Sequence, residues 1–469
     1  METLARAANR GSISTGYDID NSLKFEADNT EYLSKTPGSA GNRKTWTFSG
    51  WVKRTEIGSG GNQILSAGDT YIQFDGNALQ INFRAASENF FIITNRLFRD
   101  TSAWYHIVVQ CDTTQGTASN RAKVWVNGVQ ETSFSTSTYD NMALNYDTLM
   151  NSTNEHEVGK YSNEETTYAN FFNGYMAEMH LVDGTALTPT SFGEFDEDSG
   201  IWKPKAYAGS HGTNGFYLDF ADSANLGNDA SGGLDFTETN ITAADQATDT
   251  PTNNFCTFNP LINQNNSPTI SDGAMKSTGG GGTWNQTWGN MGVQNGKWYY
   301  EMKCTNVSYS GLIGASTAPA EGSYLVSAQF MYNTSVAAGN PARVDYTTWI
   351  NGSQVSNEST GWGSFGVNDI IGVALDLDAA TKTITFYKNG TALSGTLSQP
   401  VNLPTEMQDE FIFPLYVQYE NRYDEVNFGG YTVMSISSAA SDGNGWGTFE
   451  YAPPSGYYAL CTKNLAEYG

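Results

Sequence analysis

The stretch GKWYYEM, residues Gly296–Met302, places three aromatic residues in succession. Successive side chains of a strand point to opposite faces of a sheet, so this stretch predicts a strand that is covered on both faces. The aliphatic stretch IIGVALDLD follows at Ile370–Asp378, and TITFYKNG at Thr383–Gly390 ends in Asn-Gly. Asn-Gly is typical of a type I′ hairpin turn, because both central residues of that turn need a positive φ. The three stretches together predict an antiparallel sheet in the C-terminal half of the chain.

Two later stretches extend this pattern, VNFG at Val426–Gly429 and PSGY at Pro454–Tyr457. In this order, the five stretches resemble a SPRY domain, and the likeness covers residues 296–465. SPRY domains are binding modules, so the resemblance implies recognition through loops rather than turnover of a substrate. Thr305–Phe365 and Gly430–Trp446 depart most from the shared pattern, and we expect specificity to reside there.

The N-terminal half carries its own set of strand patterns. Apolar residues alternate with small or polar ones, or form short apolar runs, in Thr45–Val52, Leu79–Phe83, Trp104–Cys111, Ala122–Val129 and Tyr175–Val182. The fourth of these contains a second Asn-Gly pair between alternating strands, which predicts another tight hairpin. Period-two alternation is the pattern of strands with one face in a core.

Three segments of this half resemble the laminin-G-like, concanavalin A-like domains of bacteriophage virion proteins. They are Asn21–Phe25 together with Tyr32–Leu33, then Thr45–Val52, and then Phe172–Glu178. The opening segment Ala8–Asp18 is also similar to the lead-in of structural proteins of tailed phages. The resemblance implies a β-sandwich of about 200 residues in a virion protein.

The length of 469 residues is too great for a single core, and the chain is rich in glycine and aromatic residues. We predict an all-β protein made of two concanavalin A-like (jelly-roll) β-sandwiches in series. The expected parts are an N-terminal arm at 1–22, a laminin-G-like sandwich at 23–220, a polar linker or surface strap at 221–260 and a SPRY-like sandwich at 261–469. We expect residues 253–260 of the linker to pack on the second sandwich.

The charge balance limits the classes of partner. The chain has 24 basic and 49 acidic residues and a formal net charge of −25, so its field repels phosphate backbones and anionic lipid. We therefore expect no nucleic-acid partner.

No apolar run reaches the length of a membrane span, and residues 1–17 lack the apolar stretch of a signal peptide, so we expect no membrane insertion. A virion protein assembled in the host cytoplasm and displayed on the virion surface agrees with this.

Cysteine and histidine residues show no spacing typical of a metal site. The four cysteines, expected to be buried free thiols, are Cys111, Cys256, Cys304 and Cys461. The four histidines, dispersed and without a nucleophile motif beside them, are His106, His156, His180 and His211.

We expect no cofactor and no metal other than calcium. Some concanavalin A-like relatives bind calcium at loop carboxylates, which makes Asp69, Asp75 and Asp112 candidate ligands. The alternative, which we favour, is that these aspartates cap backbone amides in turns.

Sandwiches that cleave glycans use two carboxylates about 5 to 9 Å apart, which a Glu-x-Asp-x-x-Glu strand supplies on one face. The chain has no such strand. The nearest acidic run, Glu194–Asp198, lies between glycines and is expected to be a solvated acidic turn. We therefore predict a non-enzymatic protein, and retain Glu178 and Glu194 as the residues to substitute if cleavage is found.

Aromatic rings stack on the apolar faces of sugars, and Asn and Gln amides pair with sugar hydroxyls. The stretch WNQTWGN at Trp284–Asn290 offers both, and more aromatic residues lie in the variable stretch that follows. The predicted glycan-binding residues are Trp284, Trp288, Tyr332, Tyr346, Trp349 and Trp362. The alternative for each is that the ring fills a sandwich edge or a subunit contact.

The N-terminal residues Arg6 and Arg10 stand among small and polar residues. We predict that they anchor an arm in a neighbouring virion protein, with a disordered terminus as the alternative.

The predicted function is a non-enzymatic structural protein of a tailed-phage virion, either a fibre or an external decoration, that attaches to a host-surface glycan. Its expected partners are other virion proteins, the host glycan and further copies of itself. A virion-borne polysaccharide depolymerase and a purely architectural cement protein are the alternatives.

Overall fold

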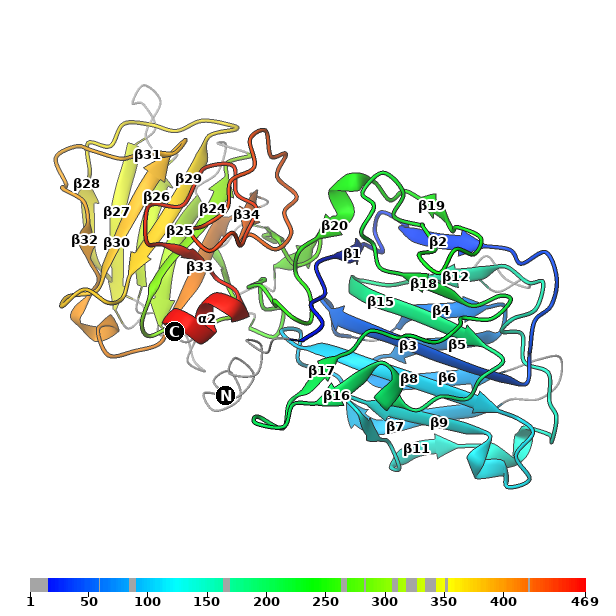
Figure 1. Ribbon diagram of the computed structural model, residues 1–469. Helices are drawn as coiled ribbons and strands as arrows, with labels where there is room; N and C mark the ends of the chain where they lie inside the picture. The colour runs from blue at the N-terminus through cyan, green and yellow to red at the C-terminus, as the bar shows by residue number, and fades with distance from the viewer. Residues whose placement is uncertain are drawn as a thin grey trace. The chain divides into compact units, whose positions relative to one another are not determined.

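The computed structural model describes residues 16–58, 60–83, 90–162, 169–262, 268–281, 284–305, 311–317, 327–333, 343–350, 353–420 and 422–469, with the backbone alone at 162, 169, 327–333, 343–344, 357 and 359. The chain divides into two compact units between Thr252 and Asn253. Each unit contains two large β-sheets, so the all-β fold class is confirmed (Figure 1).

The first unit is built from two eight-stranded sheets. One runs in the order β10 (Val129–Gln130), β9 (Ala122–Val126), β8 (Trp104–Asp112), β3 (Thr45–Arg54), β15 (Gly174–Asp183), β1 (Ser22–Phe25) and β20 (Gln246–Ala247), with β18 (Phe216–Leu218) also paired to β15. The other runs β11 (Phe134–Ser137), β7 (Phe91–Leu97), β6 (Ala78–Phe83), β5 (Thr70–Asp75), β4 (Gly61–Ala67), β12 (His156–Val158), β2 (Tyr32–Lys35) and β19 (Thr237–Thr239).

Smaller elements complete this unit. Two hairpins are formed by β13 (Lys160–Ser162) with β14 (Ala169–Phe171) and by β16 (Gly193–Phe195) with β17 (Trp202–Pro204). Short 3-10 helices lie at Ala118–Asn120, Tyr139–Asn141, Pro189–Ser191 and Ala243–Asp245.

The core of the first unit follows from the alternation in β3. Trp46, Phe48 and Val52 are fully buried in one large apolar cluster with residues from both sheets. Burial of a large apolar side chain contributes about 1.5–3 kcal/mol, so this alternation fixes which face of β3 points inward. The other face of β3, with Ser49 and Trp51, is also buried, because later segments of the chain cover it.

The second unit pairs a nine-stranded sheet with a six-stranded sheet. The first has the order β21 (Thr269–Ser271), β22 (Lys276–Thr278), β34 (Tyr423–Asn427), β24 (Lys297–Lys303), β29 (Ile370–Asp376), β30 (Thr383–Lys388) and β31 (Thr391–Ala392), with β32 (Val401–Asn402) on β30 and β35 (Tyr458–Ala459) parallel to β24. The second has the order β23 (Trp284–Trp288), β33 (Ile412–Tyr419), β25 (Gly311–Thr317), β26 (Ser327–Asn333), β27 (Arg343–Ile350) and β28 (Ser353–Ser359). A 3-10 helix, η5, spans Thr405–Met407, and the helix α2 spans Thr462–Tyr468.

The stretch GKWYYEM forms β24 and is covered on both faces, as its sequence predicts. Tyr299 packs against Phe449 and Ala459 on one face. Tyr300, on the opposite face, donates a hydrogen bond to the Gly314 carbonyl of the other sheet. Both side chains are at most 2% exposed.

The two Asn-Gly hairpins are also confirmed. Asn127 and Gly128 have φ of 47° and 77° between β9 and β10, and Asn389 and Gly390 have φ of 49° and 75° between β30 and β31. Positive φ at both central positions is the requirement of a type I′ turn. The four cysteines are free and buried.

The predicted linker at 221–260 is corrected by the structure, because residues 221–252 belong to the first unit. Strand β19 pairs with β2, and β20 pairs with β1. Asp249 accepts a 2.6 Å contact from the buried Lys53 ammonium and a 3.0 Å hydrogen bond from the Trp104 indole. A buried ion pair of this kind holds its segment firmly, because either partner alone would be an unpaired buried charge. Polar composition suggested a linker, but here the polar side chains satisfy buried donors.

Residues 253–260 pack on the second unit, as expected. Phe255 pairs with Cys461, and Phe258 pairs with Gly289; both phenyl rings are 1% exposed. The predicted N-terminal arm is corrected at its C-terminal end. The backbone N–H and carbonyl of Ile19 both hydrogen-bond the Thr252 hydroxyl, so this part of the chain belongs to the first unit.

Candidate functional site

The six predicted glycan-binding aromatic residues do not form one surface. Trp284 lies on β23 at one edge of the six-stranded sheet, where it is 40% exposed and packs against Tyr419. Trp288, on the same strand, is 1% exposed, and its indole donates a 2.7 Å hydrogen bond to the Ser316 hydroxyl. Trp288 therefore supports the sheet and is not available to a ligand, which corrects its predicted role.

The other four residues divide further. Trp349 is partly buried against the cluster that contains Trp288. Tyr332 lies on β26, and its side chain is outside the described part of the structure. Tyr346 and Trp362 lie in the interior of the second unit, and each packs against the ring of Phe386, at centroid distances of 6.4 and 5.9 Å. Of the predicted set, Tyr346 alone lines the pocket described below.

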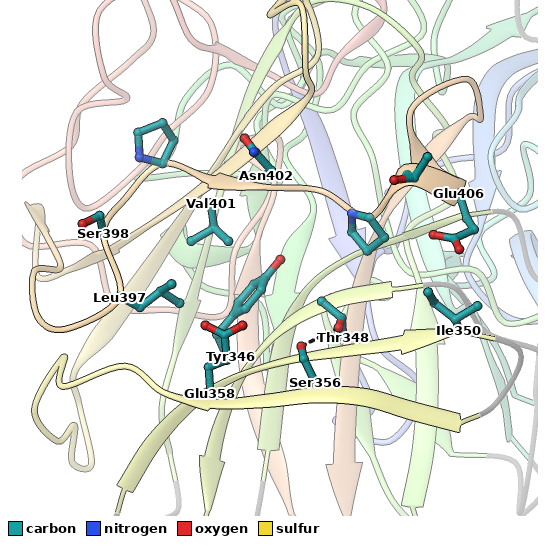
Figure 2. Close-up of a pocket in the computed structure, with 13 residues that line it drawn as sticks. Tyr346, Thr348, Ile350, Ser356, Glu358, Leu397, Ser398, Val401, Asn402 and Glu406 are labelled. Carbon is teal, nitrogen blue, oxygen red and sulfur yellow. Dashed lines mark hydrogen bonds between the residues drawn. The ribbon is translucent and has the colours of Figure 1, made fainter.

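This edge pocket lies at one edge of the second unit, between β27 and β28 and the segment that carries β32 and η5 (Figure 2). Its volume is about 590 Å³, within the usual range for a small-ligand site. Its lining residues are Tyr346, Thr348, Ile350, Ser356, Glu358, Leu397, Ser398, Pro400, Val401, Asn402, Pro404, Thr405 and Glu406.

The strand side of the edge pocket follows from the pairing of β27 with β28. Tyr346 stands opposite Glu358, and Thr348 stands opposite Ser356, so these four side chains share one face of the sheet. The hydroxyls of Thr348 and Ser356 lie 2.6 Å apart. Figure 2 marks this hydrogen bond with a dashed line. This face presents an aromatic ring, a pair of hydroxyls and a carboxylate in a row.

The opposite wall is held in place by side chains that lie behind it. The Gln399 amide accepts from the Phe386 N–H at 2.6 Å and donates to the Phe386 and Leu393 carbonyls at 3.0 and 2.7 Å. The Trp362 indole donates a 2.9 Å hydrogen bond to the Leu397 carbonyl. Trp362, predicted to contact a ligand, is thus a positioning residue for this wall.

The η5 end of the wall is fixed in a similar way. The Gln408 amide donates to the Leu403 carbonyl at 2.8 Å and accepts from the Lys382 N–H at 2.7 Å. Met407, the last residue of η5, is fully buried. These bonds leave the side chains of Asn402 and Glu406 exposed at the mouth of the edge pocket.

Tyr346 is the central feature of the edge pocket. Its ring is 3% exposed, and it points from β27 toward the segment that carries Val401 and Asn402 (Figure 2). In the described part of the chain, the Tyr346 hydroxyl has no hydrogen-bond partner. Burial, followed by the charge of Glu358, raises the pKa of Tyr346 well above its ordinary value, so the hydroxyl stays protonated. An unpaired buried hydroxyl carries a desolvation penalty of about 1–3 kcal/mol, which a ligand that pairs with it would remove.

A second polar cluster lies in the first unit and was not predicted. The sequence showed four dispersed histidines, but the fold brings three of them together. This cluster surrounds a gap too small to admit a water molecule. The gap is lined by Ser49, Trp51, His106, Glu178, His180, Phe192 and Pro204.

Within this cluster, Ser49 and His106 do not form a nucleophile and a general base. The Trp202 indole, which can only donate, gives a 3.0 Å hydrogen bond to Nδ1 of His106. The neutral ring therefore carries its proton on Nε2 and donates it to the Ser49 hydroxyl 2.8 Å away. Burial lowers the pKa of His106 to about 3, so the ring stays neutral. A general base needs a free lone pair facing the serine, and Nε2 has none.

The rest of this cluster is tied by hydrogen bonds to Glu178. Tyr217 and Tyr17 donate to the two carboxylate oxygens of Glu178 at 2.7 and 2.9 Å. Nε2 of His180 lies 3.6 Å from the same carboxylate, and its Nδ1 lies 3.1 Å from Nε2 of His211. Glu178 has a φ of 50° at an irregularity in the pairing of β15 with β3. A glutamate in this region is strained, and its buried contacts hold it there.

The remaining predicted sites separate in the structure. Asp196 of the acidic run accepts from the Ser199 N–H and hydroxyl, which lowers the pKa of Asp196 to about 2, as expected of a turn. Asp112 likewise accepts from the Thr114 N–H and hydroxyl, and Asp69 accepts from the Tyr161 hydroxyl.

Across the described ranges, no group of three or more His, Cys, Asp and Glu residues has an arrangement that could hold a metal ion. Arg6 and Arg10 lie outside the described residues. Among the helices of the described chain, none has the length and apolar character needed to cross a membrane.

Comparison with protein families identifies both domains. Residues 26–191 match the family described as the concanavalin A-like lectin/glucanases superfamily, and residues 297–428 match the SPRY domain. The chain therefore carries a concanavalin A-like domain and a SPRY domain in series. No curated protein is found to match the chain.

Solved structures resemble parts of the chain or most of it at low identity. The SPRY domain of human HERC1 is 18% identical, with a TM-score of 0.26, and the match covers 38% of this chain and 99% of that one. The SAP-like pentraxin of Limulus polyphemus is 17% identical, with a TM-score of 0.27 and coverage of 37% and 80%. Domains LG4-5 of the mouse laminin alpha1 chain are 11% identical, with a TM-score of 0.29 and coverage of 93% and 88%.

Proposed function

We propose that this chain is a non-enzymatic attachment protein that binds a surface glycan in the edge pocket of its second unit. The observation that carries the proposal is the unpaired hydroxyl of Tyr346 in a pocket whose walls alternate polar and apolar groups. A sugar ring has apolar faces and a rim of hydroxyls, so it needs aromatic or aliphatic surface beside donors and acceptors. The family matched by residues 26–191 includes lectins, which supports a glycan-binding role for the chain; these residues lie in the first unit, so the location of the site in the second unit rests on the edge pocket alone.

The test is the binding of the full chain to a panel of glycans, measured by titration calorimetry on the hits. The Tyr346→Phe variant removes the buried, unpaired hydroxyl of the edge pocket, so we expect affinity to fall about fivefold, the value of one hydrogen bond of about 1 kcal/mol. Tyr423→Phe is the matched control, because Tyr423 is exposed on β34 and does not line the edge pocket. Absence of binding to every glycan would refute the proposal.

We further propose that the chain is displayed on the surface of a tailed-phage virion, as a fibre or an external decoration, in several copies and in contact with other virion proteins. Support comes from residues 8–18, which are similar to the lead-in of tailed-phage structural proteins. Electron microscopy of particles labelled with an antibody to this chain tests the location. Label in a host lysate but not on purified particles would reject it.

A second candidate, a virion-borne depolymerase, is supported by one observation: two carboxylates, Glu358 and Glu406, line the edge pocket. Glycoside hydrolysis uses two carboxylates, one on each side of the scissile bond. The purified chain is incubated with a polysaccharide that it binds in the glycan panel, and this experiment decides between the two candidates. Reducing ends that appear with the wild-type chain and not with Glu358→Gln or Glu406→Gln would establish cleavage.

A further inference from the structure

The charged residues that line the edge pocket are both acidic. Of its thirteen lining residues, Glu358 and Glu406 are the two that carry a charge, and no lysine, arginine or histidine lines it. Both carboxylates are exposed, Glu358 on β28 and Glu406 in η5 (Figure 2). Neither forms an ion pair within the parts of the chain that the structure describes. The two lie on opposite walls, so a ligand seated between the walls meets negative charge from both sides.

Two lysines at the ends of β30, the strand that pairs with β32, are engaged elsewhere. Lys382, which precedes β30, is 7% exposed and donates to the Glu410 carbonyl at 3.4 Å. Lys388, at the end of the same strand, pairs with Asp369 at 2.9 Å. The net charge of the whole chain, −25, adds to the negative field at the edge pocket. An anionic sugar would therefore be repelled there, and a cationic group would be attracted.

The hydrogen-bonding groups of the edge pocket fit a polyhydroxylated ring better than a single cationic side chain. Tyr346, the Thr348 and Ser356 hydroxyl pair, Ser398 and Asn402 are spread over both walls. A lysine side chain of a peptide presents one ammonium on an apolar stem and would leave most of these groups unpaired. Pro400 and Pro404 offer flat apolar surface between them.

We infer that the edge pocket takes a glycan that bears protonated amines, such as an oligomer of glucosamine, with one ammonium beside Glu358, another beside Glu406, and the Tyr346 hydroxyl paired to a ring oxygen or hydroxyl. This inference rests on the proposed function and names its ligand class. A protonated amine on a sugar makes charge-assisted hydrogen bonds with carboxylates that an N-acetyl group at the same position does not make. The same carboxylates exclude uronic and other acidic sugars.

The experiment compares ligands of equal length on the full chain: a glucosamine oligomer, its fully N-acetylated form, an acidic uronate oligomer and a lysine-containing peptide. We expect the glucosamine oligomer to bind at least tenfold more tightly than the N-acetylated form at low salt, and the preference to shrink as salt rises. The double variant Glu358→Gln/Glu406→Gln should lose this preference. Glu197→Gln/Asp198→Asn removes the same two charges from an exposed turn of the first unit and should retain it.

The possible results separate the inference from the proposed function. Equal or tighter binding of the N-acetylated oligomer, a preference that survives in the double variant, or tighter binding of the uronate overturns the inference while leaving glycan binding intact. Binding of the lysine peptide with the same dependence on Glu358 and Glu406, at an affinity equal to that of the glucosamine oligomer, also overturns it. If none of the three oligomers binds and the glycan panel is negative as well, the proposed function fails with it.

Discussion

The edge pocket of the second unit and the polar cluster around His106 and Glu178 in the first unit, called here the histidine cluster, are both built from buried polar and aromatic side chains on a β-sandwich. They differ in whether these polar groups already have hydrogen-bond partners. In the cluster, the Glu178 carboxylate accepts from two tyrosines, and His106 both accepts and donates. In the edge pocket, the Tyr346 hydroxyl has no partner among the described residues. A network whose donors and acceptors are all paired stabilises the fold, whereas a polar group without a partner is available to a ligand.

The largest difference between the two units should appear on acidification. All four histidines of the chain lie in the first unit. Burial lowers the pKa of His106 to about 3 and that of His156 to about 4. Because these folded-state pKa values are below the unfolded value of about 6.5, the stability they confer is complete above pH 6.5 and is lost as the pH falls toward 4. From pH 7 to pH 5 we expect a loss of about 2 kcal/mol for each.

The second unit should respond in the opposite direction. Burial raises the pKa of Glu301 to about 7, above the unfolded value, so its contribution to stability is greatest below pH 4.5 and falls as the pH rises toward 7. Hydrogen exchange of the intact chain at pH 5 and pH 7, corrected for the intrinsic rate, resolves β8 from β24. Equal changes of protection in the two strands would contradict the contrast.

The next largest effect should come from Glu178→Ala in the histidine cluster. Removal of this carboxylate takes away the acceptor of the Tyr17 and Tyr217 hydroxyls, which lie 3.0 Å apart, so one can donate to the other and the second loses its acceptor; we expect the first unit to lose about 2 kcal/mol of stability. Urea denaturation measures it. Glu194→Ala, at a half-exposed position of the same unit, is the control and should change stability by less than about 0.5 kcal/mol.

A smaller effect of opposite sign separates the two regions directly. Ser49→Ala removes the acceptor of the His106 Nε2 proton and should destabilise the chain by about 1 kcal/mol. Tyr346→Phe removes a hydroxyl that has no partner among the described residues, so stability should be unchanged or rise by up to about 1 kcal/mol while glycan affinity falls. A loss of stability in Tyr346→Phe as large as that in Ser49→Ala would show that the Tyr346 hydroxyl is already paired.

The smallest effect is expected at Trp284. This residue lies on β23, the first strand in the order of the six-stranded sheet, whereas Tyr346 lies on β27, the fifth. Because the two are separated by three strands, Trp284→Ala should leave glycan affinity within twofold. A tenfold loss of affinity would move the glycan site from the edge pocket to the β23 edge, in agreement with the original sequence-based prediction.

Sequence patterns predicted the strands that carry strong local signals. Strands β3, β6, β8, β15, β24, β29 and β30 were each expected from alternation or an apolar run, and both Asn-Gly turns were found at the expected residues. Regular strands in the variable stretch, such as β27 and β28, were not predicted. Their residues are mostly polar, and one face of this part of the sheet lines the edge pocket instead of a dry core.

The edge pocket could be predicted only in part. Tyr346 was named as an aromatic residue in a variable stretch, but the wall at 397–406 was missed, because proline and polar residues there give no periodic signal. Trp288 and Trp362 were named for their ring chemistry. Their burial depends on which strands and loops lie beside them, and a single residue type does not reveal that.

By itself, the sequence determined the fold class, the two tight hairpins and the presence of two sandwiches in series, because alternation and turn chemistry act between residues close together in the chain. The tertiary structure alone decided which polar groups meet. Ser49, His106 and Trp202 are 57 and 96 residues apart in successive steps, and Tyr346 meets Val401 only through the order of strands in two sheets. Contacts between residues far apart in the chain decide which buried polar groups have hydrogen-bond partners. This difference separates the structural histidine cluster from the site proposed to bind a glycan.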